Sequence, residues 1–129
     1  MTRSVDPSKA ANYIIKAEEL LKTANDSLAN KRYNSAVTNA VHSSINALDA
    51  LAVKFKGKRG SDDHTEVLEL VKGILSPPQH EDIKKQFTFL ISKKNASEYQ
   101  PDLMTEKDAN EAIKWAERIL SKINAKLNP

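Results

Sequence analysis

Apolar residues with helical spacing run through the whole chain and are interrupted only by short turn signals. The first seam alternates spacings of four and three residues: Ala10, Ile14, Ala17, Leu21, Ala24 and Leu28. Such a seam marks one side of an amphipathic helix, which must be buried against other helices. No segment shows the two-residue alternation of a half-buried strand. The pattern therefore predicts an all-α protein.

Glycine, proline and polar residues divide the pattern into five predicted helices. They cover residues 8–29, 33–56, 62–75, 79–94 and 105–127. Ser8 is placed to cap the first helix, and Thr105 with Asp108 is a near-match to a capping box for the last. Because the connections are short, sequence neighbours should be antiparallel. We expect one domain over residues 1–129, an up-and-down four-helix bundle with one extra short helix. Whether residues 94–99 are helical or looped stays open.

The predicted second helix has two apolar sides. Beside its seam of larger residues runs a row of small ones: Ala36, Ala40, Ala47 and Ala50. Small side chains let another backbone approach closely, so this helix is either central to the bundle or shared with a second subunit. We expect a homodimer that uses Ala36, Ala40 and Ala47. Trp115 lies off the seam of the last helix and is either an interface residue or a residue at the edge of the core.

The composition is that of an ordinary soluble domain. With 129 residues, 29% of them charged, and a net charge of +3, the chain can bury one core and is mildly basic. The sequence has no cysteine, which excludes disulfides and thiolate sites and suits a reducing cytoplasm, the location that we expect. We find no signal-peptide pattern and no apolar run near the ~20 residues of a membrane span, so no membrane contact is expected.

Basic residues gather near the ends of two predicted helices. In the expected bundle, the helices over 33–56 and 79–94 point the same way, and their C-terminal ends meet at one pole. That pole would collect Lys54, Lys56, Lys58, Arg59, Lys93 and Lys94. Cations beside the free N–H groups of helix N-termini form an anion site suited to phosphate. The alternative is that these cations only offset the helix dipoles, with nearby carboxylates neutralising much of the field.

Two features of the helical pattern resemble the HEPN domain family. Residues 32–42, Arg-Tyr-Asn-Ser-Ala-Val-Thr-Asn-Ala-Val-His, place a Tyr at the start of an Ala-rich helix, which residues 47–51, Ala-Leu-Asp-Ala-Leu, continue. The last helix is also rich in Ala. The resemblance covers most of the chain. It implies a small helical bundle of the kind found with nucleotidyltransferases and in RNA-cleaving toxins.

The family's functional signature is an Arg followed by a polar residue, with a His a few residues further along. In its ribonuclease members, the Arg is taken to hold the scissile phosphate and the His to assist attack by the 2′-hydroxyl. By the resemblance, Lys94 stands in place of the Arg, Asn95 in place of the polar residue and Tyr99 in place of the His. Lysine still binds phosphate as a point charge, but a phenol, which titrates near pH ~10, is a poor base at neutral pH. His64, predicted close to the basic pole, is either a replacement base or an ordinary residue near a helix N-terminus.

Three functions therefore compete. The favoured one is a non-catalytic, dimeric module without a cofactor that binds a nucleotide, RNA phosphate or a partner nucleotidyltransferase at the basic pole. The second is a metal-independent ribonuclease, such as the toxin of a toxin–antitoxin pair, that works with substituted motif residues. The third is a purely structural bundle that mediates protein contacts. No metal site is expected, because His42, His64 and His80 fall on three different predicted helices.

Overall fold

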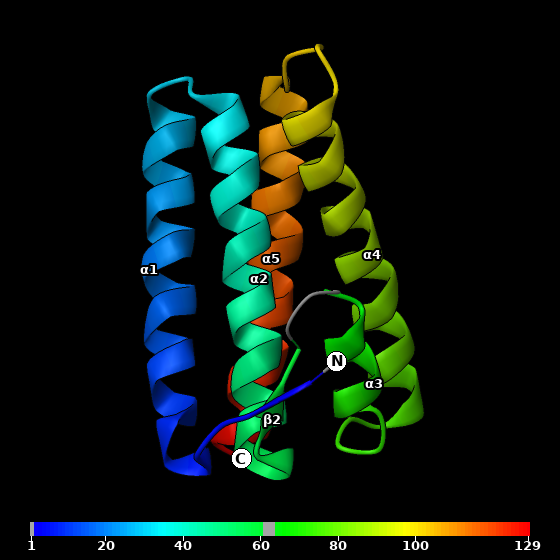
Figure 1. Ribbon diagram of the computed structural model, residues 1–129. Helices are drawn as coiled ribbons and strands as arrows, with labels where there is room; N and C mark the ends of the chain where they lie inside the picture. Colours follow the sequence, from blue (N-terminus) through cyan, green and yellow to red (C-terminus); the bar gives the residue numbers. More distant parts are fainter. Residues whose placement is uncertain (1, 61–63) are drawn as a thin grey trace.

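The computed structural model describes residues 2–60 and 64–129, and in that part of the chain four long helices form a bundle (Figure 1). These helices are α1 (Ala10–Ala29), α2 (Tyr33–Lys56), α4 (Pro77–Tyr99) and α5 (Glu106–Leu127). The short helix α3 (Glu66–Val71) packs beside the lower half of α2 and α4, and a 3₁₀ turn (Pro7–Lys9) precedes α1. The prediction of an all-α, up-and-down four-helix bundle with one extra short helix is confirmed.

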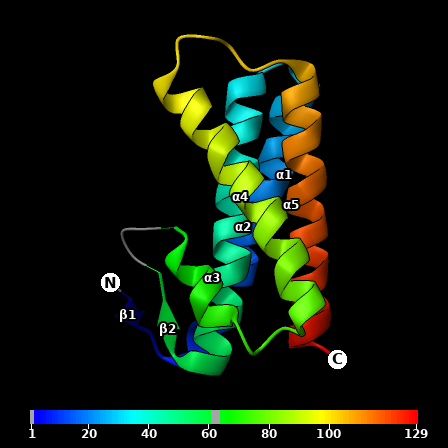
Figure 2. The same ribbon diagram turned by 90° about the vertical axis from the view of Figure 1, so that its right-hand side faces the viewer.

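The direction of α4 differs from the prediction. Helix α2 runs down to the lower end of the bundle in Figure 1, and α4 starts at that same end and runs upward, so the two are antiparallel (Figures 1 and 2). The reason is the length of α3. Its 6 residues span only ~9 Å, against ~36 Å for the 24 residues of α2, so α3 cannot return the chain to the upper end.

Helix α3 is shorter than the helix predicted over residues 62–75. It stops at Val71, and Gly73 adopts a left-handed conformation with φ of 89°, which a glycine takes without steric cost. Ile74 and Leu75 continue the apolar stripe in a turn, where their N–H groups donate to the Val71 carbonyl. The predicted start at residue 62 or 63 lies outside the described residues.

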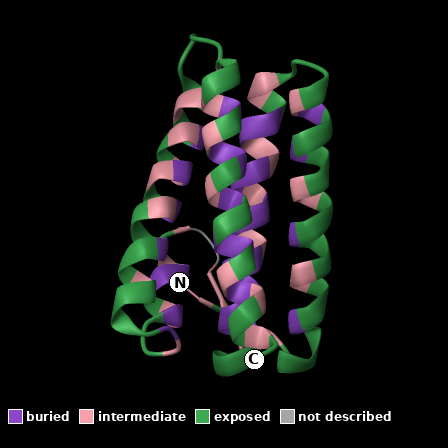
Figure 3. Ribbon diagram, turned by 180° about the vertical axis from the view of Figure 1, so that it is seen from behind, coloured by how far each residue is buried: buried purple, intermediate pink, exposed green. Residues whose placement is uncertain are grey.

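Helix α2 is the centre of the bundle and contacts α1, α3, α4 and α5. Ala36, Ala40 and Ala47 are fully buried within this single chain, where their small side chains let the neighbouring helices approach closely. Figure 3 shows the buried residues along the inward sides of the helices and the exposed ones outside. The prediction that these three alanines form a subunit interface is therefore wrong, since no surface is left there for a second chain.

The helix ends follow local capping chemistry. The predicted capping box of α5 is confirmed: Thr105 Oγ1 accepts from the Asp108 N–H, and the Asp108 carboxylate accepts from the Thr105 N–H. Ser76 and Gln79 form a second capping box, which the prediction missed, and the two prolines after Ser76 occupy the first turn of α4. Ser8 does not cap the first helix: Asp6 caps the 3₁₀ turn before it, where its carboxylate accepts the Ser8 N–H at 2.9 Å, and α1 itself starts after Lys9 without a side-chain cap.

A minimal antiparallel ribbon, which the sequence pattern did not predict, ties the N-terminal segment to the end of α2. Strand β1 (Arg3–Ser4) pairs with β2 (Lys58–Arg59) in the register Arg3 with Arg59. The Val5 N–H extends the pairing by donating to the Gly57 carbonyl at 2.9 Å.

In the part of the chain that the structure describes, no helix is long and apolar enough to cross a membrane.

We predict that Ala40→Leu destabilises the fold, because a larger side chain at this fully buried position forces α2 away from its neighbours. The free energy of unfolding from urea denaturation should fall by about 1–3 kcal/mol. Ala125→Leu, the same change at an exposed position of α5, is the matched control and should have little effect. Loss of self-association by Ala40→Leu at unchanged stability would instead support the interface that we have rejected.

Candidate functional site

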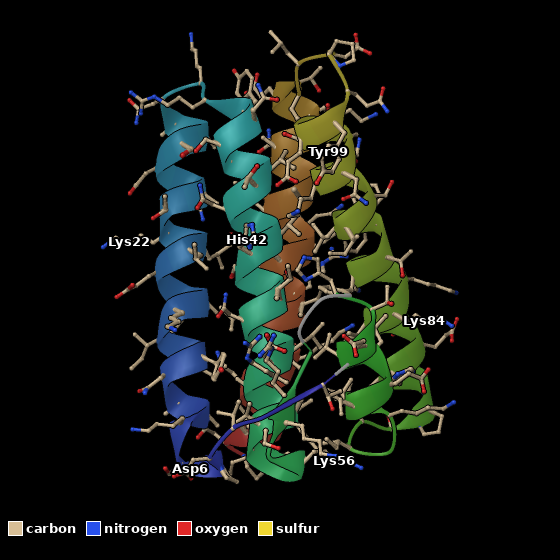
Figure 4. The ribbon with its side chains drawn as sticks, viewed as in Figure 1. Asp6, Lys22, His42, Lys56, Lys84 and Tyr99 are labelled. Carbon is tan, nitrogen blue, oxygen red and sulfur yellow. The ribbon has the colours of Figure 1, made fainter. Side chains whose placement is uncertain are left out.

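The structure does not bring the predicted basic residues to one pole. Lys54 and Lys56 lie in the last turn of α2, with Lys58 and Arg59 in β2 just beyond it. Figure 4 shows Lys56 at the lower end of the bundle and Tyr99 near the upper end. Because α4 is antiparallel to α2, Lys93 and Lys94 lie toward that upper end, so the prediction of a shared basic pole is wrong.

Lys93 instead binds the start of α5. Its Nζ donates to the Asp108 carboxylate at 2.5 Å. This hydrogen bond, followed by the one from the Thr105 N–H, lowers the pKa of Asp108 from 3.8 to about 2. Lys93 is thus engaged in fixing the N-terminal turn of α5 against α4, which is a structural role.

Lys94 has a different environment from its neighbour. It is only 9% exposed, and its ammonium donates to Glu98 one turn later at 3.0 Å. A cation at this depth is unusual, because burying charge requires a partner or a ligand. An ammonium carries three N–H donors, and the Glu98 carboxylate accepts from it once. Among the described residues, the ammonium therefore has N–H donors left for a ligand.

His42 lies midway along α2 and is half-buried (Figure 4). Its pKa is lowered first by burial and then by the charges of Lys94 and His64, while Glu98 acts in the opposite direction. Lys94, His64 and Glu98 are therefore each within electrostatic reach of His42, although α2, α4 and the segment before α3 supply these residues separately. We call His42, His64, Lys94 and Glu98 the α2–α4 cluster.

The α2–α4 cluster combines a buried ammonium, paired with one carboxylate, and two imidazoles. An ammonium binds phosphate as a point charge. A histidine whose pKa is lowered is neutral near pH 7, so His42 can accept or donate a hydrogen bond there. This is the chemistry of a site for a phosphate-bearing ligand.

The other motif positions point away from this cluster. Tyr99 is 77% exposed, and a separation of five residues places it about 140° around the helix from Lys94. Asn95 is also exposed and lines a shallow hollow on α4 together with Ser92, Ala96 and Tyr99. Glu98, rather than Tyr99, shares the face of Lys94. Residues 94–99 are helical, which settles that open point.

Trp115 lies at the edge of the core between α4 and α5, which was one of its two predicted placements. It is half-buried and packs edge-on against Phe89, with ring centroids 6.5 Å apart and an interplanar angle of 70°. Lys114 Nζ and the Arg118 guanidinium lie 4.7 Å and 4.9 Å from the ring centroid. The Trp115 ring therefore contacts two cations and one aromatic ring.

Asp49 on α2 is a buried carboxylate, only 6% exposed. Burial raises its pKa to about 6, against the opposing effects of the Gly60 N–H, which donates to its Oδ1 at 3.3 Å, and of Arg59. Asp49 thus holds Gly60, the residue directly after β2. Among the described residues, no group of His, Asp and Glu side chains is arranged to hold a metal ion.

Two of three comparisons with known proteins found matches. The sequence matches the family model for the HEPN domain over residues 10–126. The fold is similar to the crystal structure of TT1696 from Thermus thermophilus, with a TM-score of 0.76 and 22% identity over 92% of this chain and 98% of that one. It is also similar to ST0689, described as an archaeal HEPN homologue, with a TM-score of 0.71, 25% identity and the same coverage. A comparison with curated proteins gave no match.

We predict that Asp49→Asn stabilises the protein at neutral pH. The carboxyl group binds a proton more tightly in the folded chain than in the unfolded one, so stability falls as pH rises from about 4 to about 6. A rise in pKa from 3.8 to about 6 corresponds to roughly 3 kcal/mol at most. Asparagine keeps an acceptor for the Gly60 N–H and removes the charge.

Urea denaturation at several pH values between 4 and 7.5 tests this prediction. The variant should be more stable than the parent at pH 7.5, and the difference should shrink toward pH 4. Asp26→Asn on the exposed side of α1 is the control for the loss of one charge. A parent and variant with the same pH dependence would contradict the account of Asp49.

Proposed function

This chain belongs to the HEPN domain family, and we propose that it is a non-catalytic member that binds the phosphate of a nucleotide or RNA at the α2–α4 cluster. The observation that carries this proposal is the buried ammonium of Lys94, which is paired with Glu98 and lies within electrostatic reach of His42. A site between α2 and α4 replaces the basic pole that the sequence suggested. Lys94 keeps its predicted role in phosphate binding, with the two histidines as neighbours that the motif did not include.

The position of Tyr99 supports a binding role over catalysis. In the family signature a His occupies this place, whereas here an exposed phenol lies on another face of α4 from Lys94. A base must come within hydrogen-bond reach of the proton that it takes, and the geometry of α4 separates the two motif positions. The motif as this chain carries it therefore supplies a cation but no adjacent base.

The upper end of the bundle is the surface that we assign to a homodimer. Tyr99 and Leu103 are 77% and 78% exposed, and both lie at or just beyond the end of α4. Exposed large apolar side chains that lie together are typical of protein contacts. The nucleotidyltransferase partner that the family resemblance implies stays a prediction without an assigned surface.

We predict that Lys94→Ala weakens phosphate binding, whereas Lys94→Arg retains most of it, because both cationic side chains can contact a phosphate. Titration of a labelled single-stranded RNA and of a mononucleotide should show about a tenfold loss for Lys94→Ala, and the parent's affinity should fall with salt. Lys22→Ala, at an exposed position of α1, is the matched control and should bind as the parent does. Binding that is equal for the parent and Lys94→Ala would contradict the assignment of this cluster.

The second candidate function is a metal-independent ribonuclease, and the specific observation that favours it is the pair of histidines near Lys94. One neutral imidazole can take the proton of a 2′-hydroxyl, and a protonated one can supply the proton of the leaving oxygen. In this candidate, His64 acts as the replacement base that the sequence suggested or as its partner acid.

An RNA cleavage assay in the presence of a chelator separates the two candidates. We predict that the parent, His42→Ala, His64→Ala and Tyr99→Phe all leave RNA intact, because the proposed role is binding. Cleavage by the parent that is lost in His42→Ala but kept in Tyr99→Phe would establish the ribonuclease instead. A contaminating nuclease would be revealed by equal cleavage in all four preparations.

A further inference from the structure

A second surface, on the side of α4 that faces α5, has features of a ligand site. A hollow of about 320 Å³ is lined by Lys85, Gln86, Phe89, Glu111, Lys114 and Trp115. Arg118 adds a third cation at the Trp115 ring. We call these seven residues the Trp115 patch. The Trp115 patch shares no residue with the α2–α4 cluster. The neighbouring lysines of α4 serve different surroundings: Lys93 contacts Phe89 and Asp108 of α5, whereas Lys94 pairs with Glu98 and acts on His42 of α2.

The charges of the Trp115 patch favour an anionic ligand. Lys85, Lys114 and Arg118 are cationic, and Glu111 is the one carboxylate among the seven residues. The carboxylate has a neighbour of its own, since Lys107 Nζ lies 3.9 Å from it. Lys114 and Arg118 rest on the Trp115 ring, on exposed segments of α5, and are free to turn toward a phosphate.

Gln86 gives an independent indication of a missing partner. Its side-chain Oε1 is buried and accepts no hydrogen bond in the described structure. Buried polar atoms are nearly always paired, so an unpaired acceptor in the wall of a hollow is costly for the free protein. A ligand that brings a hydrogen-bond donor into the hollow, such as the amino group of a base, would relieve that cost once the amide turns toward it.

We propose that the Trp115 patch binds one base of a single-stranded nucleic acid, with Lys114 and Arg118 contacting the flanking phosphates. Aromatic side chains combined with cations bind single strands in this way, because every base offers a π-face for stacking. The base displaces one cation from the Trp115 ring, and the displaced side chain moves to the phosphate. A duplex hides its base faces and is not expected to bind here.

The chain has one tryptophan, so its fluorescence reports on this patch alone. Titration with an adenine octaribonucleotide should quench Trp115, and the same strand in a duplex should not. Adenosine monophosphate tests a free nucleotide as the ligand and should bind more weakly, because it offers fewer phosphates. No quenching by the octamer, equal quenching by the duplex, or tighter binding of the mononucleotide would overturn the proposal.

Variants that leave the core intact then test the residues. Lys114→Ala with Arg118→Ala should lower the affinity for the octamer about tenfold and reduce its salt dependence, whereas Lys22→Ala should change it less than about twofold. Gln86→Leu should raise the melting temperature, because it removes the unpaired acceptor, and should still weaken octamer binding. Suppose that Gln86→Leu changes the melting temperature without weakening octamer binding. If the variant with both Lys114→Ala and Arg118→Ala also binds the octamer as tightly as Lys22→Ala does, the patch is not a nucleic-acid site.

Two further measurements separate this site from its alternatives. Quenching of Trp115 should persist in Lys94→Ala, so failure of the α2–α4 proposal and failure of this one are distinguishable. Sedimentation of the protein without nucleic acid tests the patch as a contact between two copies. Self-association that Lys114→Glu abolishes would show a protein interface there and would overturn the proposal.

Discussion

Close packing on α2 is the constraint on which the rest of the structure depends. A helix that touches four others must carry small side chains where the other backbones come nearest, and α2 does so with fully buried alanines. The larger residues between them, such as Leu48 and Leu51, fill the remaining space. Because three long helices are held against this one, the polar residues of α2 are brought into fixed relation with those of α4.

The short α3 decides which residues meet. It leaves α4 antiparallel to α2, so the cations after α2 and those on α4 lie toward opposite ends of the bundle. The same arrangement brings Lys94 within electrostatic reach of His42, which lies midway along α2. His64, which precedes α3, also acts on His42. The antiparallel direction of α4 thus explains both why the predicted basic pole does not form and why Lys94 belongs to the α2–α4 cluster.

Much of the fold could be predicted because apolar spacing and capping residues are local signals. The bounds of α2 and the capping box at Thr105 came directly from such patterns. The end of α3 could not be read from its stripe, which continues through Ile74 and Leu75, although Gly73 was a signal that the helix stops. Because the length of α3 sets the direction of α4, the wrong end predicted for α3 also led to the wrong prediction that Lys93 and Lys94 lie at the lower end of the bundle.

The candidate site was harder to predict than the fold, because it depends on tertiary contacts. Lys94 could be identified through the family resemblance, and His64 was considered as a base. His42 could not be assigned to the site, because nothing in its neighbours on α2 shows that Lys94 of α4 acts on it. Gln86 carried no sequence signal at all, because only the packed structure reveals an unpaired buried amide oxygen.

The pKa of His42, measured by an NMR titration of its ring protons, tests the central claim most directly. Since the charge of Lys94 lowers this pKa and that of Glu98 raises it, Lys94→Gln should raise the pKa and Glu98→Gln should lower it further. Lys58→Gln, which removes a cation at the lower end of the bundle, should leave it unchanged. If the pKa of His42 is unchanged in Lys94→Gln but shifts in Lys58→Gln, then α2 and α4 are not arranged as described.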